Sequence, residues 1–320
     1  MKRIVIALSC LSLLCGIRLN AQTSEPWTGN VATEFAGGSG TEDDPYLITD
    51  GSHLALLDSK ITDYQHTLTG TYFRLENDID LGGALESPTQ WNPIGKNLIS
   101  FDGFFDGNGK KIYNIYCEQP SNSNLGFFSK VGSNGTVKDL TIASGSFNGA
   151  GNVGGIAGNS DGRIENCRNY ASVKGWKSGG YFAPTGGIVG NNMGTISGCV
   201  NFGTVTGSLD LGGLAGTLGK NSMTTGVLEN SINFGTIELI EGATGAYLGG
   251  LVGRNATGDA TINRCINLGT INFGEYTGNT QYAAALVGSL QSKTILKECL
   301  AAANVLLLNG NISGICNGTA

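Results

Sequence analysis

Histidine and charged side chains are scarce in this chain of 320 residues, and their scarcity excludes several kinds of site. The two histidines, His53 and His66, both lie in or beside one short helical pattern. Zinc enzymes commonly use two or three histidine ligands, and a Ser-His-Asp triad needs a histidine beside an exposed nucleophile. We therefore expect no metal site, no cofactor and no catalytic histidine.

Charged residues make up only 14% of the chain, and acidic residues outnumber basic ones. Lys2 and Arg3 precede an apolar run over 4–17, and the residues that follow it end in Ala21, so residues 1–21 are predicted to be a signal peptide. Its removal also takes away Arg18 and leaves 16 basic against 25 acidic residues, a net charge of −9. This charge disfavours nucleic acid as a partner.

Long hydrophobic runs are missing after the signal peptide, and none approaches the ~20 residues that would span a bilayer. Lipid anchoring is also disfavoured, because bulky Leu14 precedes Cys15 and only a short apolar run precedes Cys10. We expect an exported protein at the cell surface or outside the cell, with the periplasm as an alternative.

Glycine, in contrast, is abundant, and the chain repeats itself. One local pattern recurs at intervals of 32, 32, 34 and 34 residues, and its anchor positions are Cys167, Cys199, Ser231, Cys265 and Cys299. Ile or Leu stands three residues before each anchor, Val or Ile six after it, and Asn two after it in the first four copies. Self-similarity at this period indicates a solenoid in which each unit buries its apolar face only against its neighbours.

Stacked coils would give each strand a parallel neighbour above and below. A Gly-Gly-x-x-Gly segment opens each full coil, at 154–158, 186–190, 212–216 and 249–253. We predict an all-β parallel β-helix over residues 82–320, with about seven coils and three short strands per coil. Extended backward, the register makes Ile115 and Leu140 the anchors of the first coils, with Ile112 and Val137 three residues before them.

Residues 22–81 are predicted to form an extended lead and an N-terminal cap. Asp50 or Ser52 can cap a helix at about 52–65, where apolar residues up to Tyr64 recur at helical spacing. A helix and a strand laid over the first coil would shield its core and its unpaired strand edge.

The repeats resemble a known family. The segment Gly-Gly-Leu-Val-Gly, followed by Ile-x-x-Cys-x-Asn-x-Gly-x-Val, resembles the GLUG repeat of secreted and surface bacterial proteins. Four upstream segments resemble the lead-in to such repeats, at 40–48, 77–81, 91–95 and 105–109. The resemblance covers nearly all of residues 37–318 and implies a right-handed parallel β-helix of the pectate-lyase-like type, with a role in adhesion or binding. Some members of the family accompany a zinc peptidase that cleaves immunoglobulin A, but this sequence has no metalloprotease motif.

Six cysteines follow the signal peptide, a number that would normally suggest disulfides in an exported protein. Cysteines one coil apart would lie ~4.8 Å apart, but their side chains would point in the same direction rather than at each other. We favour a buried ladder of free thiols, and the sequence leaves the disulfide state open.

Enzymes that cleave polysaccharides provide the alternative function for this fold. They need carboxylates that converge from neighbouring coils, and the column two residues before the anchors reads Glu165, Ser197, Glu229, Asn263 and Lys297. Glu165 and Glu229 would lie two coils, ~10 Å, apart, beyond the ~6.5–9.5 Å of an inverting glycosidase pair. A polysaccharide lyase or glycoside hydrolase is therefore the second hypothesis, and we assign no catalytic residue.

The variable loops offer a candidate binding site, because each precedes a Gly-Gly segment and all should gather on one side. Their aromatic residues are Trp176, Tyr181, Phe182, Tyr247, Tyr276 and Tyr282. Aromatic rings on a rigid ledge with polar edges suit sugar rings or an extended peptide. The sequence leaves open whether the rings face a ligand or fold back onto their own strands.

We thus expect a non-enzymatic, adhesin-like binding protein that presents its loops to a glycan or to a host or cell-surface protein. Residues 312–318 are predicted to begin a further strand without a cap, and an unpaired parallel edge invites pairing. We expect that a partner or a second copy covers this edge, or that the sequence is part of a longer protein.

Overall fold

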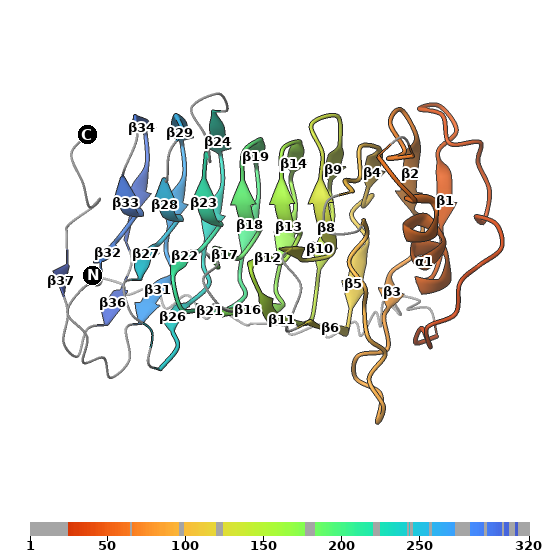
Figure 1. The fold of residues 1–320 in the computed structure, drawn as a ribbon, viewed down its shortest axis with the longest axis horizontal. Helices are drawn as coiled ribbons and strands as arrows, with labels where there is room; N and C mark the ends of the chain where they lie inside the picture. The colour runs from red at the N-terminus through yellow and green to blue at the C-terminus, as the bar shows by residue number, and fades with distance from the viewer. Residues whose placement is uncertain are drawn as a thin grey trace, which may run out of the picture.

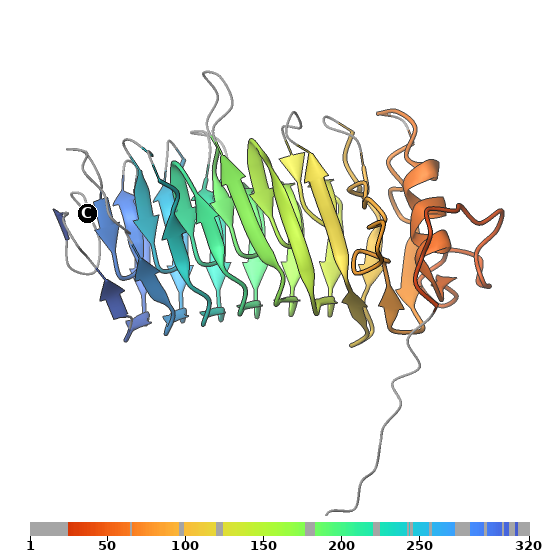
Figure 2. The ribbon, with the colours of Figure 1, turned by 90° about the horizontal axis from the view of Figure 1, so that it is seen from below.

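The coils stack along one axis into a parallel β-helix, as the repeat predicts (Figures 1 and 2). The computed structural model describes residues 25–312 apart from 65, 96–98, 120–123, 177–182, 220–224, 242, 244–245, 256–257, 273–281, 291–292, 303 and 307–310. Within these residues the strands form five sheets, numbered here in the order in which the chain passes through them. The predicted C-terminal edge at 313–318 lies outside the described residues.

Sheets 1 and 2 lie on either side of the anchor position of each coil. The strands of sheet 1 are β1 (Tyr46–Ile48), β2 (Tyr72–Leu75), β4 (Phe104–Asp106), β9 (Thr136–Lys138), β14 (Arg163–Glu165), β19 (Thr195–Ser197), β24 (Gly226–Glu229), β29 (Ala260–Asn263) and β34 (Thr294–Lys297). The strands of sheet 2 are β3 (Ile79–Asp80), β5 (Lys111–Tyr113), β10 (Thr141–Ile142), β15 (Arg168–Asn169), β20 (Val200–Asn201), β25 (Ile232–Asn233), β30 (Ile266–Asn267) and β35 (Leu300–Ala301).

Sheet 3 follows the asparagine column and leads to the variable loops. Its strands are β6 (Ile115–Gln119), β11 (Gly145–Ala150), β16 (Ser172–Trp176), β21 (Val205–Gly207), β26 (Ile237–Leu239), β31 (Thr270–Asn272) and β36 (Asn304–Leu306).

Sheets 4 and 5 come from the two halves of the Gly-Gly segments. The strands of sheet 4 are β7 (Asn124–Leu125), β12 (Asn152–Gly154), β17 (Thr185–Gly186), β22 (Asp210–Gly212), β27 (Tyr247–Gly249), β32 (Tyr282–Ala284) and β37 (Asn311–Ile312). The strands of sheet 5 are β8 (Phe128–Val131), β13 (Ala157–Ser160), β18 (Val189–Asn192), β23 (Ala215–Leu218), β28 (Val252–Asn255) and β33 (Val287–Leu290). Each full coil therefore has five short strands rather than the predicted three, because the chain bends within each Gly-Gly segment and the asparagine column forms a short strand of its own.

The apolar core consists of vertical columns of matching side chains. On sheet 1, Ile164 is in register with Ile196, which is in register with Leu228, and all three are fully buried. The anchor cysteines follow this column as free thiols. Cys199 Sγ donates to the carbonyl oxygen of Ile164 in the preceding coil, at 3.5 Å. Burial raises the pKa of Cys167, which favours the neutral thiol over the thiolate.

A second column links the coils through buried amides, and its members are Asn169, Asn201, Asn233 and Asn267. Asn201 Nδ2 donates to Asn233 Oδ1 at 3.0 Å, and Asn201 Oδ1 accepts from Asn169 Nδ2 at 3.1 Å. Within its own coil Asn201 also donates to the carbonyl oxygen of Gly203 and accepts from the Gly203 N–H group. Each amide thereby fixes its own turn and joins it to the neighbouring coils.

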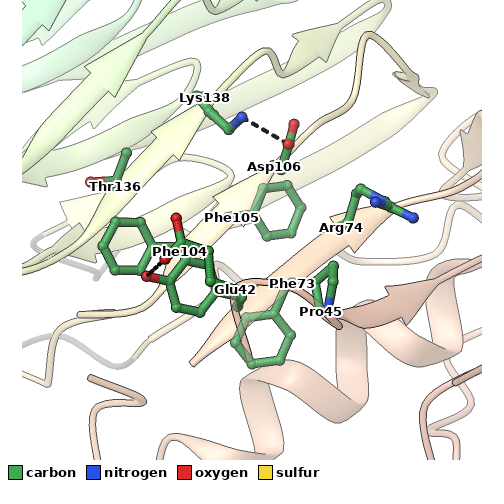
Figure 3. A pocket seen from close by; sticks show the side chains of 10 residues that line it. Glu42, Pro45, Phe73, Arg74, Phe104, Phe105, Asp106, Thr136 and Lys138 are labelled. Atoms are coloured by element: carbon green, nitrogen blue, oxygen red, sulfur yellow. Dashed lines mark hydrogen bonds and ion pairs between the residues drawn. The ribbon is translucent and has the colours of Figure 1, made fainter. Parts of the chain in front are cut away.

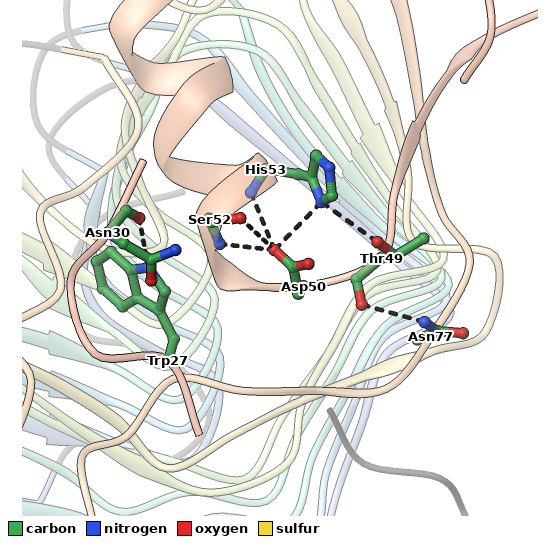
Figure 4. Close-up of polar contacts among 7 residues, drawn as sticks. All are labelled: Trp27, Asn30, Thr49, Asp50, Ser52, His53 and Asn77. Atoms are coloured by element: carbon green, nitrogen blue, oxygen red, sulfur yellow. Dashed lines mark hydrogen bonds and ion pairs between the residues drawn. The ribbon is translucent and has the colours of Figure 1, made fainter. Parts of the chain in front are cut away.

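The single helix of the described residues, α1 (Gly51–Lys60), packs at the N-terminal end of the stack (Figures 1 and 2). Asp50 caps this helix, because its Oδ1 accepts from the N–H groups of Ser52 and His53 (Figure 4). Burial alone would raise the pKa of Asp50, but the Ser52 hydroxyl, the His53 charge and these N–H groups outweigh it and lower that pKa. Gly51 leaves the space that the Trp27 ring occupies, since a Cβ there would lie 2.4 Å from the ring.

Two details of the predicted cap differ from the structure. The helix ends at Lys60 rather than near residue 65, because Ile61 leaves the helical conformation and is fully buried, whereas Tyr64 is exposed. The cap strands β1, β2 and β3 belong to sheets 1 and 2, so the stacked sheets begin before residue 82.

The predicted register of the first coil is wrong. Val137 pairs with Phe105 rather than standing above Ile112, and Ile112 pairs with Ile142 on sheet 2. Phe105 and Lys111 are six positions apart, whereas their partners in the next coil, Val137 and Thr141, are four positions apart. The first turn is therefore two residues longer. Ile112 and Ile115 are three residues apart, like each anchor and the apolar residue before it, but they lie one turn further along the coil.

The asparagine column allows a direct test of the fold. We expect Asn201→Ala to lower the free energy of unfolding by about 2–4 kcal/mol, because it leaves several buried polar partners unsatisfied. Chemical denaturation would measure this loss. Asn263→Ala, on the partly exposed face of β29, should change the stability by less than about 0.5 kcal/mol. Equal effects of the two substitutions would contradict a structural role for the column.

Candidate functional site

Three of the six predicted ledge residues are described by the structure. Trp176, Tyr247 and Tyr282 can be placed, whereas Tyr181, Phe182 and Tyr276 lie outside the described residues. Trp176 ends β16 on sheet 3, is half-buried and lies two coils before Tyr247. The tyrosines begin β27 and β32 on sheet 4. The structure thus brings two of the predicted residues together and places the tryptophan on a different sheet.

Tyr247 and Tyr282 form a stacked pair on neighbouring coils. They occupy matching positions, their ring centres are 5.4 Å apart, and their planes differ by 8°. Tyr282 is 37% exposed and Tyr247 is partly exposed, so neither ring is folded into the core. Leu248 follows Tyr247 and is fully buried, which is the alternation expected of a strand with one face on the core.

The same column contains a buried carboxylate. Asp210 begins β22 in register with Tyr247, and its side chain is fully buried. Arg254, on β28 of sheet 5, donates from Nη2 to Asp210 Oδ2 at 2.7 Å. The guanidinium carbon of Arg254 lies 5.5 Å from the ring centre of Tyr247, within the range of a cation–π contact. These residues, Asp210, Tyr247, Arg254 and Tyr282, define a site that we call the Asp210 corner.

The third glycine of the Gly-Gly-x-x-Gly segment makes this corner geometrically possible. A Cβ at Gly253 would lie 2.5 Å from the backbone nitrogen of Leu211 and 2.7 Å from the carbonyl carbon of Asp210. Only glycine therefore lets β28 approach β22 so closely. Arg254, the next residue, is held beside Asp210 as a result.

Buried polar side chains continue from the corner along sheet 5. Asn159, Asn191, Thr217 and Arg254 occupy matching positions on four successive coils. Thr217 donates to Asn191 Oδ1 at 2.6 Å. Asn159 Oδ1, Asn191 Nδ2 and Asp210 Oδ1 are buried without a hydrogen-bond partner in the described structure. The row and the neighbouring Asp210 therefore contain unsatisfied donors and acceptors that lie beneath the surface.

Burial controls the ionisation of Asp210. It raises the pKa of Asp210 to about 6, while the charge and the hydrogen bond of Arg254 act in the opposite direction. Asp210 is therefore mostly ionised at neutral pH and takes up a proton as the pH falls through about 6. Because this pKa exceeds that of an exposed aspartate, the contribution of Asp210 to stability is largest in acid and is lost as the pH rises through about 6.

Sequence reasoning missed a second row of aromatic side chains on the surface. One residue after the asparagine column stand Tyr170, Phe202, Phe234 and Leu268, each 40–46% exposed. The first two ring centres are 4.4 Å apart and the next two are 5.1 Å apart, with nearly parallel planes. Their recurrence one residue after the asparagines is the signal in the sequence that identifies this row.

The carboxylates of sheet 1 do not form a close pair. Glu165, Ser197 and Glu229 are in register on three successive coils, so a serine separates the two glutamates. Ser197 donates to Glu229 at 3.2 Å, while Glu165 forms an ion pair with Arg163. In the described part of the chain no group of three or more His, Cys, Asp or Glu side chains could hold a metal ion.

The chain matches two curated proteins over part of its length. A segment of 136 residues, 41% of this chain, is 35% identical to a "Putative Gly-rich membrane protein" of Evansella cellulosilytica and covers 15% of that protein. A segment of 177 residues, 52% of this chain, is 30% identical to halomucin of Haloquadratum walsbyi and covers 2% of it. The matched segments are thus small parts of both relatives. No family model matches the chain, so the resemblance to the GLUG repeat stays a prediction.

A solved structure shows the same architecture. It is described as a "putative immunoglobulin A1 protease" from Bacteroides ovatus, and it aligns with a TM-score of 0.62 over 88% of this chain and 87% of the other. The two sequences are 20% identical, so the similarity shows the fold alone. None of the helices within the described residues is long and apolar enough to cross a bilayer.

The ion pair of the Asp210 corner should give a stability effect that depends on pH. Arg254→Gln leaves a buried carboxylate unpaired, so we expect a loss of about 3–5 kcal/mol at pH 8. The loss should shrink at pH 5, where Asp210 is protonated. Urea denaturation at both pH values measures the difference, and the double variant Asp210→Asn/Arg254→Gln should recover most of the stability at pH 8. The same loss at pH 5 and pH 8 would show that Asp210 does not carry the charge.

Proposed function

We propose that this protein is a non-enzymatic, adhesin-like binding protein, exported to the bacterial surface, and that it binds a glycan at the Asp210 corner. The observation that carries this proposal is the pair of stacked, partly exposed tyrosines, with Arg254 held beside Tyr247 by the buried Asp210 carboxylate. A sugar ring can pack its C–H groups against a tyrosine ring, and its hydroxyl groups can hydrogen-bond to the tyrosine hydroxyls and to the Arg254 guanidinium.

The shape of the corner supports an elongated ligand. Asp210, Tyr247 and Tyr282 occupy matching positions on three successive coils, so equivalent contacts repeat along the axis. A polymer of similar units, such as a glycan, can use such repeated contacts, and the tyrosines combine apolar ring area with a hydroxyl group. The strands hold these side chains before any ligand arrives, which reduces the entropy cost of binding.

The relatives support the proposed location. One is named as a membrane protein and the other as halomucin, names that fit proteins of the cell surface. The separation of Glu165 from Glu229 by a full coil supports binding over cleavage, because an inverting pair needs a closer approach.

A glycan array would identify a saccharide, and calorimetry would then measure its affinity. We expect Tyr247→Ala/Tyr282→Ala to weaken binding by about tenfold or more, since aromatic side chains commonly dominate binding energy. Phe202→Ala is the matched control, because it removes a ring of similar exposure from the other aromatic row. Unchanged affinity in the double tyrosine variant would remove the corner from the proposal. Release of reducing ends or unsaturated products from any saccharide would contradict the non-enzymatic assignment.

The same binding should depend on pH. Ionised Asp210 holds Arg254 beside the Tyr247 ring more firmly than the neutral acid does, so affinity for a neutral glycan should rise as the pH increases through about 6. Calorimetry at pH 5 and pH 8 would measure the change, and Asp210→Asn should remove it. A rise of the same size in Asp210→Asn would assign the pH dependence to another group.

A further inference from the structure

A hollow lies on the outer face of sheet 1, near the N-terminal end of the stack (Figure 3). Its volume is about 230 Å³, and it is lined by residues of β2, β4 and β9 together with Glu42 and Pro45. It differs from the Asp210 corner in its sheet and its residues. The volume is below the ~300 Å³ at which pockets for drug-sized ligands begin, so it suits a single small ring.

One side of the hollow is aromatic. Tyr72 and Phe104 occupy matching positions on neighbouring coils, and their ring centres are 4.4 Å apart with planes that differ by 5°. Thr136 continues this column on the next coil. The Tyr72 hydroxyl points to the Glu42 carboxylate, at 3.5 Å. The stacked rings therefore give the hollow an apolar wall with a hydroxyl and a carboxylate at its end.

The other side is charged but balanced. Two residues further along the same strands, Arg74, Asp106 and Lys138 form a second column in register. Lys138 Nζ lies 2.9 Å from Asp106 Oδ2, and a dashed line marks this ion pair in Figure 3. Arg74 donates from Nε to Glu76 at 2.7 Å. The two basic residues of the lining offset its two acidic residues, Glu42 and Asp106.

We infer that this hollow binds one neutral, polyhydroxylated ring, that is, a sugar unit of a glycan. An ion would have to compete with ion pairs that are already formed, whereas hydroxyl groups can use the remaining lone pairs and N–H groups of the same side chains. The apolar C–H groups of a sugar can pack against the aromatic wall that Tyr72 and Phe104 form. The inference goes beyond the proposed function, because the hollow shares no residue with the Asp210 corner.

Saturation-transfer NMR with small probes tests the inference. The neutral probes are the methyl glycosides of glucose, galactose, mannose and N-acetylglucosamine, and the charged probes are glucuronic acid and glycine. We expect a signal from at least one neutral probe and an affinity about tenfold weaker in Tyr72→Ala. Lys138→Gln, which removes the charge and keeps a hydrogen-bonding group on a side chain that is one atom shorter, should also weaken binding. Thr195→Ala, in the same outward column three coils beyond Phe104, should leave it unchanged.

The outcomes separate the two sites. Binding that persists in Asp210→Asn but falls in Tyr72→Ala and Lys138→Gln supports a sugar site in the hollow. Binding lost in Asp210→Asn and kept in Tyr72→Ala and Lys138→Gln overturns it and leaves the corner as the site. A signal from glucuronic acid or glycine alone overturns the neutral-sugar assignment, and a signal from no probe overturns the inference as a whole.

Discussion

The vertical register between coils is the constraint on which the rest of the structure depends. The Asn201 amide is joined to the asparagines of the coils on both sides and to its own turn, so four hydrogen bonds fix one buried side chain. A slip of one residue on any coil would interrupt this column and turn the side chains of its strands to the opposite face. A shift of the register would therefore destabilise this fold more than the replacement of any one apolar residue.

Register also explains why the surface features occur as columns. Parallel strands place matching positions one above another, so similar residues on successive coils become neighbours although they are far apart in sequence. The pairs Tyr72–Phe104, Tyr170–Phe202 and Tyr247–Tyr282 all arise in this way. The Asp210 corner adds a second mechanism, because the close approach at Gly253 brings sheet 5 against sheet 4 of the preceding coil.

Much of the fold could be predicted from the sequence, because the columns at Ile164 and Asn169 repeat with little change in length. The first coil could not, since its longer turn after Phe105 breaks the period. The candidate site was visible only in part. The positions of Tyr247 and Tyr282 in the variable loops identify them from the sequence. Asp210 and Arg254 lie 44 residues apart on different sheets, and the repeat spacing does not predict contacts between sheets.

The protein is a stack of coils that gathers polar and aromatic groups into columns, and we propose that two of these places bind a glycan. The most direct test of this claim is a crystal structure of the protein with the glycan that binds best on an array. We expect density for a sugar chain that contacts Tyr247, Tyr282 and Arg254, with the protein backbone unchanged from the free state. Density for the glycan only at sites away from both the Asp210 corner and the hollow of sheet 1 would contradict it.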